Sequence, residues 1–159
     1  LMLKRKAPES LVIGLDPDPD VLRRAKRKTA NSGINVTFTQ GFARDAGHVL
    51  PAGATKAISS LVFHQVPSGE KRAGLAAMHA SLVTGGEVHI ADYGLQRTPL
   101  MRVLFKQIQR LDGAENTTPN AQGILPVLMT EVGFTDVREL SVIPTPTGSI
   151  SLYFGRKSR

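Results

Sequence analysis

Residues 11–20 read LVIGLDPDPD, a short apolar run that ends in an acid and passes into two further acid–proline steps. The run 11–15 is almost wholly apolar, which is typical of a parallel strand buried on both faces. Asp20 is a suitable N-cap for a helix expected over 21–31. A buried strand that ends in a carboxylate predicts an α/β fold in which that carboxylate, Asp16, lies at a ligand-binding edge of the sheet.

The rest of the chain continues the alternation of strands and helices. Strands are predicted over 35–40, 57–63, 87–91, 137–143 and 149–154, and helices over 68–83, 99–111 and 123–131. A loop with a weak helical turn is predicted over 41–56, a second loop over 112–122, and a tight turn at 84–86. The last two strands are joined by PTPTG, which indicates an antiparallel hairpin. This order predicts a Rossmann-like α/β fold, a doubly wound and mostly parallel sheet with an antiparallel C-terminal strand pair.

Composition indicates a soluble protein of the cytoplasm. The chain has 159 residues, 41% of them hydrophobic, and it has no cysteine, which excludes disulfides and thiolate metal sites. No apolar stretch approaches the roughly 20 residues of a membrane span. The net charge of +7 comes largely from residues 4–6 and 23–28, where acids are interspersed and aromatic residues are absent. We interpret these cations as a solvated helix face, so nucleic acid is not expected as a partner.

Five segments, in order, resemble the class I S-adenosylmethionine-dependent methyltransferases, specifically the small family that has a methyltransferase domain and little else. GLDPDPDVLRRAKRK resembles that family's second strand, its ribose-binding acid and the next helix, and TFTQGFARD resembles the third strand and the turn that meets adenine. SSLVFHQVP resembles the fourth strand with its histidine near the methyl acceptor. SLVTGGEVHIADYG resembles the glycine turn and fifth strand, and PVLMTEVGFTDV the late helix, turn and sixth strand.

On the cofactor side, the resemblance implies that S-adenosylmethionine is bound. Asp16 is expected to bind the ribose diol, with Pro17 shaping the adjoining wall. Gly41 and Phe42 are expected to lie against the adenine. Many relatives carry an acid where Phe42 stands, so here the contact to the adenine amine would have to come from the backbone or from Arg44-Asp45.

On the acceptor side, the resemblance implies that Ser60, Phe63 and His64 border the methionine portion and the methyl acceptor. His64 is the candidate catalytic base, because its unperturbed pKa lies near working pH. The alternative is a strand-end histidine that is satisfied by a backbone group. Asp92 is interpreted as a turn residue after its strand. The remaining histidines lack the spacing of a metal site.

The acceptor itself is expected to be a small molecule. Without cysteine, the covalent route to pyrimidine carbon-5 is closed. The Asn/Asp-Pro-Pro-Tyr/Phe run of enzymes that methylate exocyclic amines is also missing, since SLVFHQVP stands in its place.

The sequence departs from the family at its start. No G-x-G-x-G occurs anywhere, and LMLKRKAPES resembles the back half of the helix that follows the family's glycine-rich loop. We therefore expect 1–159 to be a single methyltransferase-like domain that is N-terminally incomplete. The family's strand order is three-two-one-four-five-seven-six, so the missing first strand is central. Residues upstream of this sequence, direct pairing of the second and fourth strands, or a strand swapped within a homo-oligomer could each fill its place, and we favour the first.

Two other classes of function compete with methyl transfer. A dinucleotide-dependent oxidoreductase also places an acid after its second strand, but the glycine turn and the terminal antiparallel pair fit the methyltransferase pattern better. A degenerate or truncated methyltransferase fold could act as a non-catalytic partner or as a basic binding module. The missing glycine loop and the net charge of +7 support that alternative.

Overall fold

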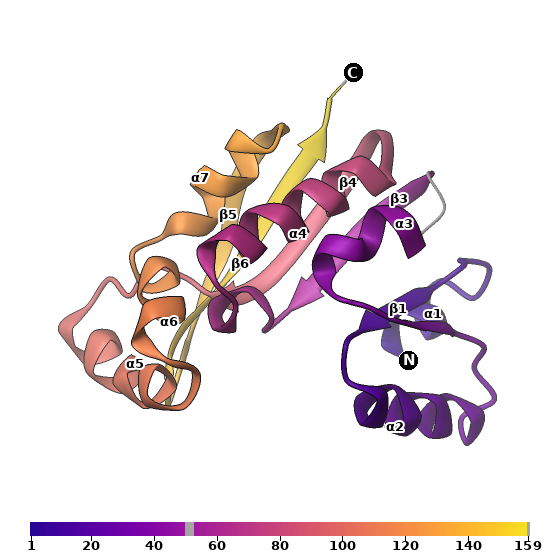
Figure 1. Cartoon of the computed structure of the whole chain (residues 1–159), viewed down its shortest axis with the longest axis horizontal. Helices are drawn as coiled ribbons and strands as arrows, with labels where there is room; N and C mark the ends of the chain where they lie inside the picture. The colour runs from indigo at the N-terminus through magenta and orange to yellow at the C-terminus, as the bar shows by residue number, and fades with distance from the viewer. Residues whose placement is uncertain (50–52, 159) are drawn as a thin grey trace.

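Two separate sheets form the frame of the protein in the computed structural model, which describes residues 1–49 and 53–158 (Figure 1). The N-terminal half contains α1 (Met2–Lys6), β1 (Ile13–Asp16), α2 (Pro19–Ala30), β2 (Thr37–Gln40), the 3-10 turn η1 (Ala43–Asp45), α3 (Ala46–Val49), β3 (Ala54–Ser60) and the 3-10 turn η2 (Phe63–Gln65). The C-terminal half contains α4 (Ser68–Ser81), β4 (Leu82–Tyr93), α5 (Pro99–Asp112), α6 (Ala114–Ala121), α7 (Ile124–Glu131), β5 (Phe134–Thr145) and β6 (Gly148–Lys157).

The strand order confirms the predicted fold class and leaves one place in the sheet open. Strands β1 and β2 pair in parallel as a two-stranded sheet, and the four-stranded sheet has the order β3-β4-β6-β5. In that sheet β3 and β4 are parallel, whereas β6 runs antiparallel to both β4 and β5. Among the described residues β1 and β3 do not pair, so the sheet has not closed over the position expected for the first strand.

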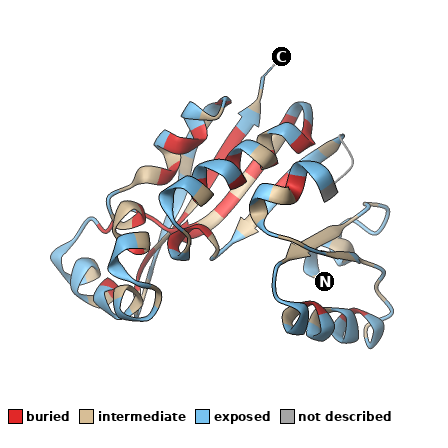
Figure 2. Ribbon diagram, viewed as in Figure 1, coloured by how far each residue is buried: buried red, intermediate tan, exposed pale blue. Residues whose placement is uncertain are grey.

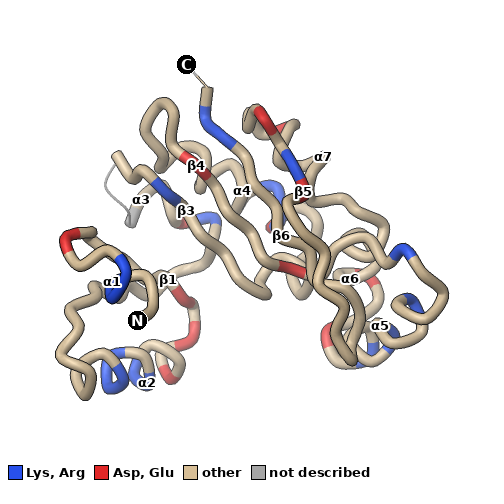
Figure 3. The backbone as a smooth tube through the Cα atoms, turned by 180° about the vertical axis from the view of Figure 1, so that it is seen from behind, with Lys and Arg blue, Asp and Glu red and all other residues tan. Residues whose placement is uncertain are grey.

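The hydrophobic core lies between the four-stranded sheet and the helices on one of its faces. Helices α4 and α7 cover that face, and their inner sides and β4 carry the buried positions (Figures 1 and 2). Large side chains of the core include Phe63, Leu75, Ile90, Met129, Phe134 and Tyr153. Viewed from behind, the other face of the four-stranded sheet has no helix over it among the described residues (Figure 3). The core that positions the candidate site is therefore one-sided.

Helix α2 begins two residues earlier than the sequence predicts. The Asp18 side chain accepts the backbone N–H of Asp20 at 2.7 Å, and Asp18, not Asp20, is the N-cap. Pro19 then occupies the first helical position, where its fixed φ is suited and its missing N–H costs nothing. The assignment of Asp20 as N-cap was wrong because Asp18-Pro19 is the stronger start signal.

The predicted loop over 112–122 is also wrong, since Ala114–Ala121 forms helix α6 despite an internal proline. Tertiary contacts stabilise this short helix. Thr117 and Asn120 are fully buried, and Asn120 Nδ2 donates to the Tyr93 carbonyl at 3.1 Å. In the other predicted loop, 41–56, the structure has the turn η1, the short helix α3 and, from Ala54, the start of β3, while residues 50–52 lie outside the described residues.

The predicted turn at 84–86 lies within β4. The pairing with β3 jumps from Ala54 opposite Leu82 to Lys56 opposite Glu87, so the residues between Leu82 and Glu87 bulge out of the ladder. Gly85 has a φ of 80°, a value that favours glycine. The predicted turn is thus present as a bulge inside β4, and the strand predicted over 87–91 continues to Tyr93.

Candidate active site

Polar side chains gather where β1, β3 and β4 reach their carboxyl ends, the edge at which doubly wound folds bind ligands. Asp16 is the last residue of β1, and the turn η2 with His64 follows β3. Asp92 lies one residue before the end of β4. These residues fall into two clusters. Asp16 lies beside β1 and β2, and His64 and Asp92 are buried between β3, β4 and α6.

Asp16 is half-buried, and a proline-containing turn fixes its carboxylate. Its Oδ1 accepts the backbone N–H of Asp18 at 2.9 Å. Among the described residues no hydrogen bond reaches its second oxygen, Oδ2. A carboxylate with one oxygen held and the other available can accept a hydrogen bond from a ligand hydroxyl.

Pro17 and Gly41 lie beside Asp16 because β1 and β2 pair in register, with Asp16 opposite Gln40. The Gly41 N–H donates to the Asp16 backbone carbonyl at 3.2 Å, and Gln40 Nε2 donates to the Pro17 carbonyl at 3.1 Å. A Cβ at Gly41 would lie 3.1 Å from a methyl of Leu15, so a larger residue would disturb this junction. The structure thus brings three of the predicted cofactor residues together.

Phe42 continues from this junction with its side chain 50% exposed. The Arg44 guanidinium lies 4.6 Å from the centroid of its ring and also pairs with Glu70. The Asp45 carboxylate accepts the Phe42 N–H at 2.9 Å. Among the described residues no hydrogen bond reaches Asp45 Oδ1, whereas the Phe42 backbone is engaged on both sides, its carbonyl accepting the Asp45 N–H at 2.9 Å. The source of the adenine-amine contact stays a prediction.

His64 and Asp92 form a buried hydrogen-bonded pair. His64 Nδ1 lies 2.7 Å from Asp92 Oδ1, and both side chains are within the protein. Asp92 Oδ2 also accepts the N–H groups of Val62 at 3.0 Å and Phe63 at 2.7 Å, and Oδ1 accepts that of Tyr93 at 2.8 Å. The interpretation of Asp92 as a turn residue is wrong, since it is a fully buried acceptor of four hydrogen bonds.

The protonation pattern of His64 follows from its neighbours. Because a carboxylate oxygen accepts, the short contact with Asp92 Oδ1 requires a proton on His64 Nδ1. Nε2 lies 3.3 Å from Asp112 Oδ2, at the last residue of α5. The ring also meets Tyr93 edge-on, with centroids 4.9 Å apart. His64 therefore lies between two carboxylates, with Asp92 at Nδ1 and Asp112 at Nε2.

Lys71 is the functional candidate that sequence reasoning missed. It lies on α4 with no exposed surface, and its ammonium donates to the backbone carbonyls of Phe63 and, at 2.9 Å, Asn116. Burial lowers the pKa of Lys71 to about 8, against the opposing effect of Asp92. A signal was available, because Lys71 stands at helical spacing before the inner-face residue Leu75.

Ser60 and Phe63, the other residues predicted at the methionine and acceptor region, differ in their surroundings. Ser60 ends β3 and is exposed, beside the open edge of the four-stranded sheet. The side chain of Phe63 is fully buried and belongs to the hydrophobic core. Their contacts to a cofactor remain predictions.

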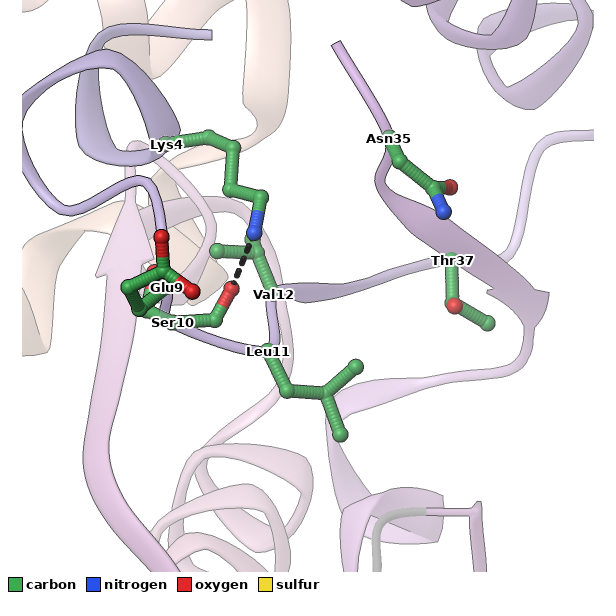
Figure 4. Close-up of a pocket in the computed structure, with 7 residues that line it drawn as sticks. All are labelled: Lys4, Glu9, Ser10, Leu11, Val12, Asn35 and Thr37. Atoms are coloured by element: carbon green, nitrogen blue, oxygen red, sulfur yellow. Dashed lines mark hydrogen bonds between the residues drawn. The ribbon is translucent and has the colours of Figure 1, made fainter.

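An open pocket lies at the opposite end of the small sheet, next to α1 (Figure 4). Leu11 and Val12 line it just before β1, and Asn35 and Thr37 line it at the start of β2. Lys4 Nζ donates there to the Ser10 carbonyl at 2.6 Å. Because this pocket is at the amino ends of the strands, it is separate from the carboxyl-end groups described above.

Within residues 1–49 and 53–158 no three histidine or acidic side chains cluster closely enough to hold a metal ion. In the same ranges no helix has the length and apolar character needed to cross a membrane.

The residues present fit the nucleoside part of an adenosine-containing cofactor. The available oxygen of Asp16 suits a ribose hydroxyl, and Gly41 lies beside it at the end of β2. For the amino-acid part, the sequence contains no G-x-G-x-G loop. The fold and these strand ends define an α/β nucleotide-cofactor-binding domain.

Comparison with known proteins identifies the family. The family model described as a methyltransferase domain matches residues 1–86, more than half of the chain, so the chain belongs to this family. Proteins of the family use S-adenosylmethionine. No curated protein matches the chain.

Solved structures share the fold. An O-methyltransferase family protein from Burkholderia thailandensis is 18% identical, covers 98% of this chain and superimposes with a TM-score of 0.77. Human N-acetylserotonin methyltransferase, solved with S-adenosylmethionine, is 19% identical, covers 98% of this chain and has a TM-score of 0.67. The chain spans 46% and 43% of those two proteins, less than half of each.

Proposed function

We propose that the protein transfers a methyl group from S-adenosylmethionine to a small-molecule acceptor, with His64 as the general base and Asp92 as its partner. The observation that carries this proposal is the buried 2.7 Å hydrogen bond between His64 Nδ1 and Asp92 Oδ1 at the ligand-binding edge of the sheet. Such a pair fixes the tautomer in which Nε2 can accept a proton.

Each residue has a distinct task in this proposal. Asp16 binds the ribose through its available oxygen, and Gly41 and Phe42 lie against the base. When bound, the cofactor supplies the electrophilic methyl group of its sulfonium. His64 Nε2 takes the proton of an acceptor hydroxyl as the oxygen attacks, and the Asp92 carboxylate stabilises the resulting imidazolium.

The buried setting of His64 supports a small acceptor. The histidine is 6% exposed, and the end of α5 approaches it through Asp112. The 3.3 Å between His64 Nε2 and Asp112 Oδ2 leaves no room for an acceptor atom, so in this proposal Asp112 must move aside before a hydroxyl reaches Nε2. A hydroxyl on a small molecule can reach this buried nitrogen more easily than a group within a folded macromolecule can.

Calorimetric titration with S-adenosylhomocysteine tests the cofactor half of the proposal. We expect micromolar binding by the parent protein, a loss of at least tenfold in Asp16→Ala, and an unchanged affinity in the matched control Asp20→Ala. Asp20 is an exposed carboxylate paired with Arg23 on α2, so its removal alters the same net charge away from the ribose position. Equal binding by both variants would refute the role of Asp16.

Methyl transfer from labelled S-adenosylmethionine to a panel of small phenols and alcohols tests the catalytic half. We expect His64→Ala to lose activity while it keeps its affinity for S-adenosylhomocysteine. The non-catalytic alternative rests on the missing glycine loop, and it predicts neither binding nor transfer. Cofactor binding without transfer to any acceptor would retain the binding site and reject His64 as a base for this substrate class.

A further inference from the structure

The turn that carries His64 depends on charged groups outside it. η2 is a single 3-10 turn, too short to satisfy its own backbone groups. On one side, the Asp92 carboxylate accepts the N–H groups of Val62 and Phe63. An anion therefore holds the donors of the turn.

A cation holds the acceptors of the same turn. The Lys71 ammonium donates to the Phe63 carbonyl and lies 3.5 Å from the carbonyl of His64. Lys71 is 0% exposed, so water does not compete for these contacts. Two opposite charges, Asp92 and Lys71, thus clamp the backbone of the His64 turn from its two sides.

The backbone just before this turn needs such a clamp. Leu61 has a φ of 55°, in the left-handed region that a leucine rarely occupies. A residue held there persists only when its surroundings fix it. Without the clamp, relaxation of Leu61 would rotate the turn that follows it and move His64.

The same ammonium also reaches the acceptor side of the site. Its third partner is the Asn116 carbonyl on α6, at 2.9 Å. Helix α6 packs against η2 and against α5, whose last residue, Asp112, lies 3.3 Å from His64 Nε2. One buried cation therefore ties the histidine turn to the helices that face the basic nitrogen.

We propose that Lys71 is a positioning residue, which holds the His64 turn against α6 and so sets the orientation of Nε2 toward the methyl acceptor. This inference rests on the proposed function for its catalytic consequence, but its structural consequence can be measured separately. Lys71 itself touches neither the acceptor nor the cofactor residues beside β1.

Lys71→Met tests the proposal, because it keeps the length of the side chain and removes all three donors. We expect kcat to fall at least tenfold, with the affinity for S-adenosylhomocysteine unchanged within twofold, since Asp16 lies on the other sheet. Lys71→Arg, which keeps the charge and the donors, should recover part of the rate. Arg72→Met is the matched control, because Arg72 is the exposed neighbour on α4 and pairs with Glu131.

The Nδ1 proton of His64 provides a readout that does not require turnover. In proton NMR the hydrogen bond to Asp92 should give a downfield resonance in the parent protein and in Arg72→Met, and this resonance should shift or broaden away in Lys71→Met. Urea unfolding of each variant identifies any that fails to fold, in which case Lys71→Arg carries the comparison.

The two proposals fail in different ways. A folded Lys71→Met variant with the parental kcat and the parental His64 resonance would overturn the role of Lys71. A parent protein that shows the resonance and its loss in Lys71→Met, but no methyl transfer, would leave the clamp in place and reject the proposed function.

Discussion

Replacement of Asp92 by asparagine separates the structural and chemical roles of the buried pair. Asp92 accepts four hydrogen bonds, two on each oxygen, from three backbone N–H groups and from His64. An amide has one accepting oxygen, and its nitrogen can only donate. With the oxygen placed toward Val62 and Phe63, the amide nitrogen must face His64 Nδ1 and the Tyr93 N–H.

The consequences for His64 and for stability follow from that geometry. His64 can adapt by moving its proton to Nε2, so that Nδ1 accepts from the amide and Nε2 donates to Asp112. The Tyr93 N–H cannot adapt and loses its partner, at a cost of about 1–3 kcal/mol. The loss of the negative charge weakens the remaining backbone bonds, while a neutral amide is cheaper to bury, so we expect Asp92→Asn to lower the free energy of unfolding by about 3 kcal/mol in total.

The same change removes the catalytic lone pair. With the proton on Nε2, His64 cannot accept one from the acceptor, and general-base catalysis typically contributes about 10²- to 10⁴-fold in rate. We therefore expect kcat of Asp92→Asn to fall by about that factor. Urea unfolding followed by circular dichroism gives the stability, nitrogen-15 NMR of the imidazole gives the tautomer, and methyl transfer gives the rate.

Two results would refute this reasoning. A variant as stable as the parent would show that the four hydrogen bonds to Asp92 do not stabilise the fold as described. A variant with the switched tautomer and the parental rate would show that the proton on Nδ1 is irrelevant to turnover. Asp20→Asn, an exposed carboxylate, serves as the control and should change neither quantity by a measurable amount.

Three further predictions concern stability. The pKa of Lys71 in the folded protein, about 8, lies below the ordinary value of 10.5, so between these pH values only the unfolded chain holds the proton. The free energy of unfolding of the parent should therefore rise by up to about 3 kcal/mol from pH 8 to 10.5, relative to that of Lys71→Met. The same pH dependence in both proteins, measured by urea unfolding, would contradict this. Gly94→Ala should lower the free energy of unfolding by about 2 kcal/mol or more, since its Cβ would lie 2.1 Å from Ser151 Oγ and 2.4 Å from the Tyr153 hydroxyl, and an unchanged melting temperature would disprove that contact. Asp18→Ala removes the N-cap of α2 and should cost about 1 kcal/mol by urea unfolding, an expectation that fails if the variant matches the parent.

The fold could be predicted from sequence where the spacing of apolar residues and the turn or capping residues at the ends of a segment indicate the same element. The apolar run before Asp16 and the terminal hairpin are both local signals, and the structure contains both elements. Helix α6 could not be predicted in this way. Its sequence, AENTTPNA, contains a proline and four polar residues of low helix propensity. Burial of Thr117 and Asn120 against other parts of the chain stabilises it, and no local pattern encodes those contacts.

In the candidate site, too, the residues marked by a local pattern could be predicted and those defined by contacts distant in sequence could not. Asp16 and His64 stand at strand ends that the sequence marks, so their positions could be predicted. The role of Asp92 could not, because an acid after a strand looks the same whether it ends a turn or accepts four buried hydrogen bonds. The spacing from Lys71 to Leu75 could have placed Lys71 on the inner face of its helix, but its partners could not be predicted, because the Phe63 and Asn116 carbonyls are far apart in the chain.

The division into two sheets has a consequence for local opening. The β1–β2 ladder spans four residue pairs, and of the described residues in β1, β2 and α2 only Leu22 and Thr29 are buried. A two-stranded parallel ladder with so little apolar burial opens at low free-energy cost, whereas β4 and β6 lie inside the main core. Amide hydrogens of β1 and β2 should therefore exchange with solvent by local opening, and those of β4 only when the whole protein unfolds. Asp16 would then reside on the part of the molecule that opens first, while His64 and Asp92 remain on the part that opens last.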